Sequence, residues 1–169
     1  MAVTLRQARP EEWEQARRLR LEMLGDAPHS FNDRLADAEG WDDARWRSRL
    51  SSAVLDDSVL FVAVDAAGDW QAQMGAREYL NHQPARVWLL EVYVSPAHRG
   101  TGVAAELLAA VERWAVTRGH ARLYLDVHED AEPARRFYRR AGFVETGTRR
   151  PYPNDPRKQE LEMVKELSR

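Results

Sequence analysis

The sequence of 169 residues contains no cysteine. This absence excludes disulfide bonds, thiolate metal sites and a cysteine nucleophile. Histidine is scarce as well, and no two histidines have the spacing of metal ligands, so we expect no metal site. The histidines are His29, His82, His98, His120 and His128.

A large charge of one sign and a long apolar run are missing too. Lysine and arginine total 25 and aspartate and glutamate 27, which gives a net charge of −2. Nucleic-acid and membrane-surface binders depend on a basic surface, so we expect neither kind of partner. The first segment, MAVTLRQARPEEWEQ, has no basic-then-apolar signal pattern, and no apolar run approaches membrane-spanning length. We therefore expect a cytoplasmic protein.

The composition that is present is typical of a globular chain. Apolar residues make up 44% of the sequence and charged residues 31%, which argues against disorder. The length suffices for one domain with a sizeable core, and neither a repeat nor a convincing linker divides the chain. The sequence therefore predicts a single domain over residues 1–169.

Apolar periodicity predicts the order of helices and strands. Alternation over 3–8 indicates a first strand, and an apolar stripe with acids in its first turn indicates a helix over 10–24. The further expected elements are a helix over 41–50, strands over 58–65, 69–80 and 87–94, a helix over 102–118, a strand over 122–128, a short helix beginning near Pro133, and strands over 143–147 and 159–167. The order β-α-α-β-β-β-α-β-α-β-β predicts a mixed α/β sheet and not a repeating βαβ ladder.

The segment over 100–105 places two glycines directly before the helix over 102–118. It fits the dinucleotide fingerprint G-x-G-x-x-G/A, and Asp126 ends the next strand, near the place of a ribose-binding acid. However, residues 95–99 separate the motif from the preceding strand, a hairpin comes before it, and no second mononucleotide half follows. A Rossmann site is therefore the weaker hypothesis. The glycine pair alone is also compatible with a simple tight turn.

A frame that begins one residue earlier fits better. Arg99-x-x-Gly102-x-Ala104 follows a hydrophobic strand and the step VSP over 94–96. In these residues, and in ARRFYRRAGF over 134–143, the chain resembles the GNAT superfamily of N-acetyltransferases along nearly its whole length. The resemblance implies a twisted, mostly antiparallel sheet of about seven strands with about four helices. It also implies transfer of an acetyl group from acetyl-CoA to an amine.

The chemistry of this loop independently suits an anion. Glycines let the main chain approach a bulky group, and the first N–H groups of a helix have no intrahelical partners. The helix dipole adds about half a positive charge, and Arg99 offers a planar cationic fork. By the resemblance, the anion is the pyrophosphate of coenzyme A, and main chain of the central strand holds the pantetheine arm. The expected coenzyme A contacts are Val92, Tyr93, Val94, Arg99, Gly100, Thr101, Gly102, Val103, Ala104 and Tyr138.

Three side chains are candidates for the catalytic chemistry. The resemblance aligns Tyr138 with a tyrosine that faces the sulfur of coenzyme A, and a phenol can protonate a departing thiolate. Asp126 resembles in position the catalytic glutamate of the ribosomal-protein alanine N-acetyltransferases. Glu91 is the alternative base, a carboxylate in an otherwise apolar strand, where burial would raise its pKa. Each of the three is also compatible with an ordinary packing or structural role.

The acceptor is expected to be a primary amine of a small molecule or the α-amine of a peptide. Because the chain has no cysteine, direct attack in a ternary complex is the expected route. Specificity lies on loops in such scaffolds, so we expect the acceptor pocket to involve residues 25–33, 78–84 and 149–156. A homodimer is compatible with the sequence, and a non-catalytic acyl-CoA-binding module is the alternative function. The expected polar lining is Glu78, Tyr79, His82, Tyr152, Asn154 and Asp155.

Overall fold

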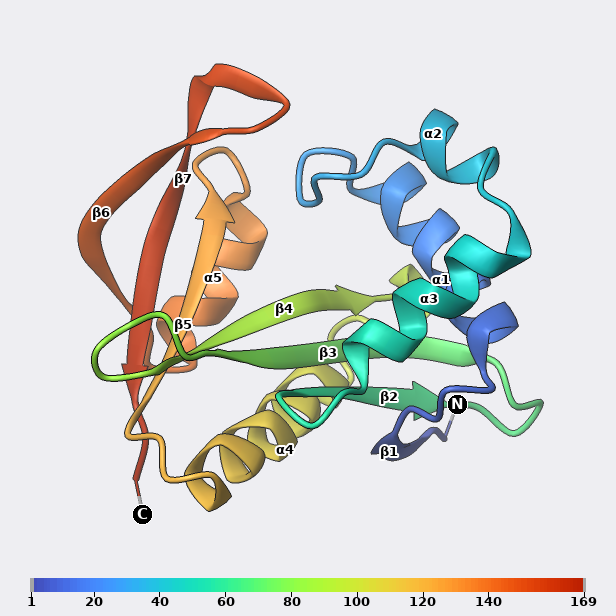
Figure 1. Cartoon of the computed structure of the whole chain (residues 1–169), viewed down its shortest axis with the longest axis horizontal. Coiled ribbons are helices and arrows are strands. Elements are labelled where there is room, and N and C mark those ends of the chain that lie inside the picture. Colours follow the sequence, from blue (N-terminus) through green and yellow to red (C-terminus); the bar gives the residue numbers. More distant parts are fainter. Residues whose placement is uncertain (1, 169) are drawn as a thin grey trace.

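The computed structural model describes residues 2–168 and contains one sheet of seven strands (Figure 1). The strands follow the order β1-β2-β3-β4-β5-β7-β6, and every neighbouring pair is antiparallel except β4 and β5. The predicted mixed, mostly antiparallel sheet is therefore confirmed. The strands are β1 (Thr4–Gln7), β2 (Ser58–Val64), β3 (Trp70–Tyr79), β4 (Arg86–Val94), β5 (Arg122–His128), β6 (Val144–Tyr152) and β7 (Asp155–Glu166).

The described residues form five α-helices, one more than predicted. The additional helix, α2, is the five-residue segment LADAE, which has no side-chain cap and buries only Ala38. Such a short segment carries no helical periodicity that a sequence could reveal. A 3-10 turn over Pro96–His98 follows β4. The α-helices are α1 (Trp13–Asp26), α2 (Leu35–Glu39), α3 (Asp43–Ala53), α4 (Val103–Thr117) and α5 (Glu132–Arg140).

Helices cover both faces of the β2–β4 part of the sheet. Alternate residues of β2 belong to different cores: Val59 packs with α4, whereas Leu60 packs with α1 and α3. This explains why β2 reads as a continuous apolar run, because both of its faces are buried. Figure 1 shows α4 on one side of these strands and α1 and α3 on the other.

The parallel pair β4 and β5 separates early. Its register comprises only Val87 opposite Leu123 and Trp88 opposite Tyr124. Beyond that point β5 and β7 rise away from β2–β4, as the upright strands in Figure 1 show. A parallel ladder that ends this soon leaves main-chain groups of β4 without strand partners. The fold therefore opens the sheet at the strand that precedes the glycine loop.

A bulge in β4 lies at the start of this opening. Gly75 pairs with Leu90 and Gln73 pairs with Tyr93, so two residues of β4 oppose one residue of β3. Glu91 is one of these two residues and has φ +57, the left-handed region. A Cβ at Gly75 would lie 3.0 Å from the Val59 carbonyl, so glycine lets the neighbouring strands approach at this point. The bulge redirects the main chain of β4 toward the gap.

No helix within residues 2–168 is long and apolar enough to cross a membrane.

Candidate active site

The divergence of β4 and β5 opens a cavity of about 810 Å³. Its wall combines the loop after α1, strand β4, the loop before α4, the C-terminal half of β5, and α5. All three candidate catalytic residues line this cavity, and so do all the expected coenzyme A contacts except Thr101. The Thr101 hydroxyl instead donates a hydrogen bond to the His98 carbonyl, with 2.6 Å between the oxygens, and closes the 3-10 turn.

The glycine loop has the shape of an anion cradle. Gly100 and Gly102 have φ +73 and +91, which only glycine adopts without strain. A Cβ at either position would meet no heavy atom within 4 Å, so the space beside the main chain is open. Gly102 precedes α4, and no side chain caps that end of the helix. The first amide groups of α4 are thus left for an external acceptor.

Arg99 already has partners within the chain. Its Nε donates to the Val94 carbonyl over 3.0 Å, and its guanidinium pairs with Asp26 at the end of α1. The hydrogen bond from Arg99 is the main reason why the pKa of Asp26 lies below its usual range. In this arrangement Arg99 links α1 to β4, and a phosphate would compete with Asp26 for the guanidinium.

Tyr138 lies in α5 between two aromatic rings. Its ring centroid is 5.4 Å from that of Phe137 and 5.7 Å from that of Phe143, and the residue is 7% exposed. Burial raises the pKa of its hydroxyl well above the usual value, so the phenol stays protonated at neutral pH. Tyr138 packs against aromatic neighbours and also lines the cavity, so a packing role and a catalytic role are compatible in this residue.

Asp126 belongs to an acidic cluster on β5 and β7. Its Oδ1 accepts a hydrogen bond of 2.8 Å from Arg150, whose other nitrogen donates to Glu162 over 2.7 Å. Burial is the main cause that raises the pKa of Asp126, and the charge of Glu162 adds to it against the effect of Arg150. Glu160 also lines the cavity, and its pKa is raised by burial first and then by Asp126.

Sequence reasoning missed three members of this cluster: Arg150, Glu160 and Glu162. The register places Glu162 directly opposite Asp126 and Glu160 opposite His128. One signal was present, because Glu160 and Glu162 alternate with apolar residues in QELEM and so share a strand face. The sequence alone gave no register between β5 and β7, and therefore no reason to place these acids beside Asp126.

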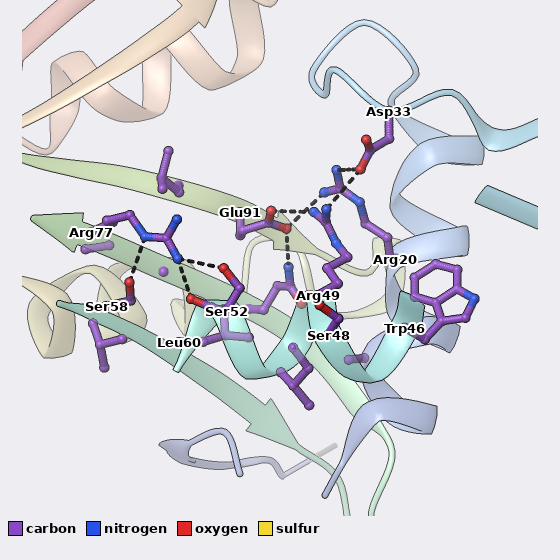
Figure 2. A pocket seen from close by; sticks show the side chains of 18 of the residues that line it. Arg20, Asp33, Trp46, Ser48, Arg49, Ser52, Ser58, Leu60, Arg77 and Glu91 are labelled. Atoms are coloured by element: carbon purple, nitrogen blue, oxygen red, sulfur yellow. Dashed lines mark hydrogen bonds and ion pairs between the residues drawn. The ribbon is translucent and has the colours of Figure 1, made fainter. Parts of the chain in front are cut away.

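Glu91 lies in a closed ring of charges on the other side of the cavity (Figure 2). Its carboxylate forms ion pairs with Arg20 over 2.9 Å and with Arg49 over 2.6 Å. Both guanidinium groups also pair with Asp33, over 2.7 and 3.1 Å, and Gln73 donates to Glu91 over 3.2 Å. The charged partners of Glu91 come from other segments, so its surroundings differ from those of the apolar residues of its own strand. Two arginines neutralise Glu91 and hold the left-handed residue of the β4 bulge in place.

The fold and this cavity can now be compared with known proteins. Residues 12–143 match the family model described as the acetyltransferase (GNAT) family. The chain belongs to the GNAT acetyltransferase family. It is 37% identical to streptothricin acetyltransferase of Streptomyces lavendulae over 91 residues. These aligned residues make up 54% of this chain and 47% of that protein. An uncharacterized N-acetyltransferase of Mycobacterium tuberculosis is 40% identical over 63 residues, 37% of this chain and 40% of that protein.

Solved GNAT structures resemble the whole chain or most of it. Nourseothricin acetyltransferase superposes with a TM-score of 0.60 at 29% identity, over 67% of each chain. A phosphinothricin acetyltransferase of Sinorhizobium meliloti in complex with AcCoA gives a TM-score of 0.77 at 18% identity, over 99% of this chain and 90% of that one. The second likeness shows the fold alone. This GNAT chain spans less than half the length of the two curated relatives named above.

Two expected walls of the acceptor pocket in this GNAT protein are wrong. Glu78, at the end of β3, pairs with Arg118 and His120 beyond the end of α4 and does not line the cavity. The reason is the direction of β3, whose last residue pairs with Arg86 at the start of β4, far from the bulge. The other two segments meet, because the Tyr152 hydroxyl donates to the Phe31 carbonyl over 3.1 Å. Of these two, however, only the segment over 25–33 lines the cavity; Tyr152, Asn154 and Asp155 do not.

Two further observations complete the site of this GNAT chain. Asp130, in the loop between β5 and α5, pairs with Lys158 over 2.7 Å, and the Ncap residue of α5 is Ala131. His128, the last residue of β5, is 7% exposed and packs edge-on against Tyr152. Within residues 2–168, no group of three or more histidine, aspartate or glutamate side chains is arranged to hold a metal ion.

Proposed function

We propose that this GNAT chain transfers an acetyl group from acetyl-CoA to a primary amine by direct attack in a ternary complex. The observation that carries the proposal is one cavity that joins three features: the glycine loop before α4, the buried phenol of Tyr138, and the carboxylates of Asp126 and Glu160. An anion cradle, a proton donor and a proton acceptor are the parts that this reaction needs.

The fit to acetyl-CoA rests on open main chain. The positive φ angles of Gly100 and Gly102 turn the amide groups before α4, and no atom of the chain fills the space where their Cβ atoms would be. The pyrophosphate would bind there. Beyond Trp88, β4 has no ladder with β5, so main-chain groups of Val92 and Tyr93 that do not pair with β3 are available to the amides of the pantetheine arm. At Val94, the pantetheine arm would share the carbonyl with Arg99.

In the proposed reaction, the amine nitrogen forms a bond to the thioester carbonyl carbon as the carbon–sulfur bond breaks. The amine must lose a proton, and Asp126 with Glu160 is the pair that can take it. Burial raises the pKa of both carboxylates, which brings a base closer to the pH at which it must work. The charge of Asp126 is the second cause of the raised pKa of Glu160, so a proton on Asp126 would also affect Glu160.

Tyr138 would act at the departing sulfur. A thiol has an ordinary pKa of about 8.5, so the leaving thiolate is stabilised by a nearby proton donor. Because burial raises the pKa of Tyr138, the hydroxyl keeps its proton until the thiolate forms. The phenol then donates that proton or shares it through a hydrogen bond.

The charge of the cavity wall supports a cationic acceptor. Arg150 pairs with Asp126 and with Glu162 behind it, whereas no cation lies within 4.0 Å of Glu160 among residues 2–168, which leaves negative charge at the cavity wall. The relatives named for streptothricin and nourseothricin support a small-molecule amine over a peptide. We therefore propose a small molecule that carries at least one further positive charge.

Release of free thiol from acetyl-CoA, measured with a panel of amines that includes streptothricin, lysine and an alanyl peptide, tests this function. We expect turnover with a cationic small molecule. Tyr138→Phe should lower kcat about tenfold or more with unchanged affinity for coenzyme A, because only the proton donor is lost. Tyr79→Phe makes the same chemical change outside the cavity and should leave kcat unchanged. Binding of acetyl-CoA without turnover of any amine would support the non-catalytic module instead.

A further inference from the structure

A second cavity of about 410 Å³ lies between α3 and the face of β2–β4 (Figure 2). It is separated from the acetyl-transfer cavity by the charge ring, because Arg20, Asp33, Arg49 and Glu91 line both. Its volume lies in the range of small-molecule sites. Nothing in the proposed reaction uses this space.

The charges of this cavity do not cancel. Within the ring, two guanidinium groups and two carboxylates balance each other. Two further arginines line the cavity, Arg45 from α3 and Arg77 from β3. Arg45 has no carboxylate within 4.0 Å among residues 2–168, and Arg77 approaches only Asp57, at 4.0 Å and outside the lining. Among residues 2–168, the charge of Arg45 therefore remains without a carboxylate partner, and the lining itself carries more positive than negative charge.

The two arginines lie on different walls of the cavity. Arg77 donates to the hydroxyl groups of Ser58 and Ser52, which fixes it against the end of α3, as Figure 2 shows. The Arg45 guanidinium instead lies 4.2 Å from the centre of the Trp41 ring, and the residue is exposed. Arg45 is thus held by stacking, with its hydrogen-bond donors left for another acceptor.

The rest of the lining combines apolar side chains with three serines and Gln73. Val59, Leu60 and Ala76 come from β2 and β3, and Leu90 comes from β4 beside the bulge. Trp41 adds an aromatic surface next to Arg45. Such a lining suits a ligand with an apolar body, because each buried apolar group contributes favourably, while a planar anion suits the guanidinium fork.

We propose that this second cavity binds a small ligand in which one carboxylate is attached to an apolar body, and that Arg45 receives the carboxylate. The carboxylates already in the wall do not repel such a ligand strongly, because the ring pairs each of them with two guanidinium groups. The bound ligand contacts the ring that holds the β4 bulge, so this site is placed to influence the geometry of the acetyl-transfer cavity.

Titration calorimetry with phenylacetate tests the proposal on the full chain, in the presence and absence of saturating coenzyme A. We expect one binding event both with and without coenzyme A, and no binding of the neutral analogue phenylacetamide. Arg45→Ala should weaken phenylacetate binding about tenfold through loss of the charge-assisted contact. Arg47→Ala is the matched control. Arg47 also lies on α3 and stacks on a tryptophan, with its guanidinium 4.4 Å from the centre of the Trp13 ring of α1, but it does not line the cavity.

The outcomes separate this proposal from the acetyl-transfer function, because neither acetyl-CoA turnover nor an amine enters the measurement. Failure of phenylacetate to bind, or equal binding of phenylacetamide, would overturn the carboxylate site. Binding that coenzyme A displaces, or that Arg47→Ala weakens as much as Arg45→Ala, would place the anion elsewhere. Thermal melting of both variants checks that each one folds, and Arg45 is exposed, so a folded variant is expected.

Discussion

Two groups of carboxylates lie on opposite sides of the β4–β5 opening, and their partners differ. On the side of α1 and α3, two acids meet two arginines in a closed ring that includes Glu91. On the side of β5 and β7, Asp126, Glu160 and Glu162 meet one close arginine, Arg150, while Arg86 stays 4.0 Å from Glu162. The first group is neutral and the second keeps negative charge.

This difference in charge balance indicates that carboxylates bordering the same cavity have different roles. Each carboxylate of the ring is held by two guanidinium groups, which suits a structural role. Asp126 and Glu160 have raised pKa values because burial disfavours their charged forms and because acidic neighbours repel them. We infer that the ring holds the bulge in shape, whereas the acidic cluster takes the proton of the amine.

The largest expected effect comes from the acidic cluster. Asp126→Asn removes a carboxylate of the proposed base and should lower kcat about 100-fold, because a general base contributes at least that much. Steady-state release of free thiol from acetyl-CoA measures it. Asp130→Asn makes the same chemical change in the next loop, at a residue that pairs with Lys158 outside the cavity. Equal rates for Asp126→Asn and Asp130→Asn would refute the proposed role.

The stability of Asp126→Asn supplies an internal control for that experiment. The folded chain holds the proton of Asp126 more tightly than the unfolded chain, whose pKa is about 3.9. The free energy of unfolding of the wild type therefore falls as the pH rises from the unfolded pKa through the raised folded pKa. Asparagine does not ionise, so the variant does not lose this stability. The difference in melting temperature, variant minus wild type, should therefore increase as the pH rises from 4 to 7. A relative decrease over this range would contradict the raised pKa.

The next largest effect is expected in the ring. Glu91→Gln keeps the shape of the side chain but leaves the buried Arg20 with less negative charge, and should cost about 2 kcal/mol of unfolding free energy. The β4 bulge should relax, with a fall in kcat of about tenfold that is smaller than that of Asp126→Asn. Denaturant unfolding measures the first quantity. Glu166→Gln is the control, because its ion pair with Arg122 is exposed on both sides and should contribute almost nothing.

Local patterns were enough to predict part of this molecule. The alternation in β1 and the apolar run of β4 gave their strands, and the frame from Arg99 to Ala104 gave the loop before α4. These features depend on neighbours in sequence, on periodicity and on backbone angles that glycine alone adopts readily. The expected coenzyme A residues therefore lie together in the structure, with Thr101 as the exception.

The partners of each carboxylate could not be predicted, because they come from distant segments. Arg20 and Glu91 are brought together by packing of α1 on the sheet, and Glu162 reaches Asp126 only through the β5–β7 register. The wrong expectation for Glu78 has the same origin, since the direction of β3 decides which end of the strand reaches the cavity. A sequence names the ionisable groups, but tertiary structure decides how many opposite charges each one meets.

The pH dependence of kcat/KM, measured between about pH 5 and pH 9, compares the two groups within one experiment. Ionisation of the amine substrate affects the wild type and both variants equally. Differences between their pH profiles therefore report on ionisable groups of the enzyme. We predict that Glu91→Gln lowers the profile without moving its acidic limb. Asp126→Asn should move that limb to lower pH, because Glu160 loses the negative neighbour that helps to raise its pKa. A limb that moves in Glu91→Gln and stays in place in Asp126→Asn would make Glu91 the base and contradict this assignment.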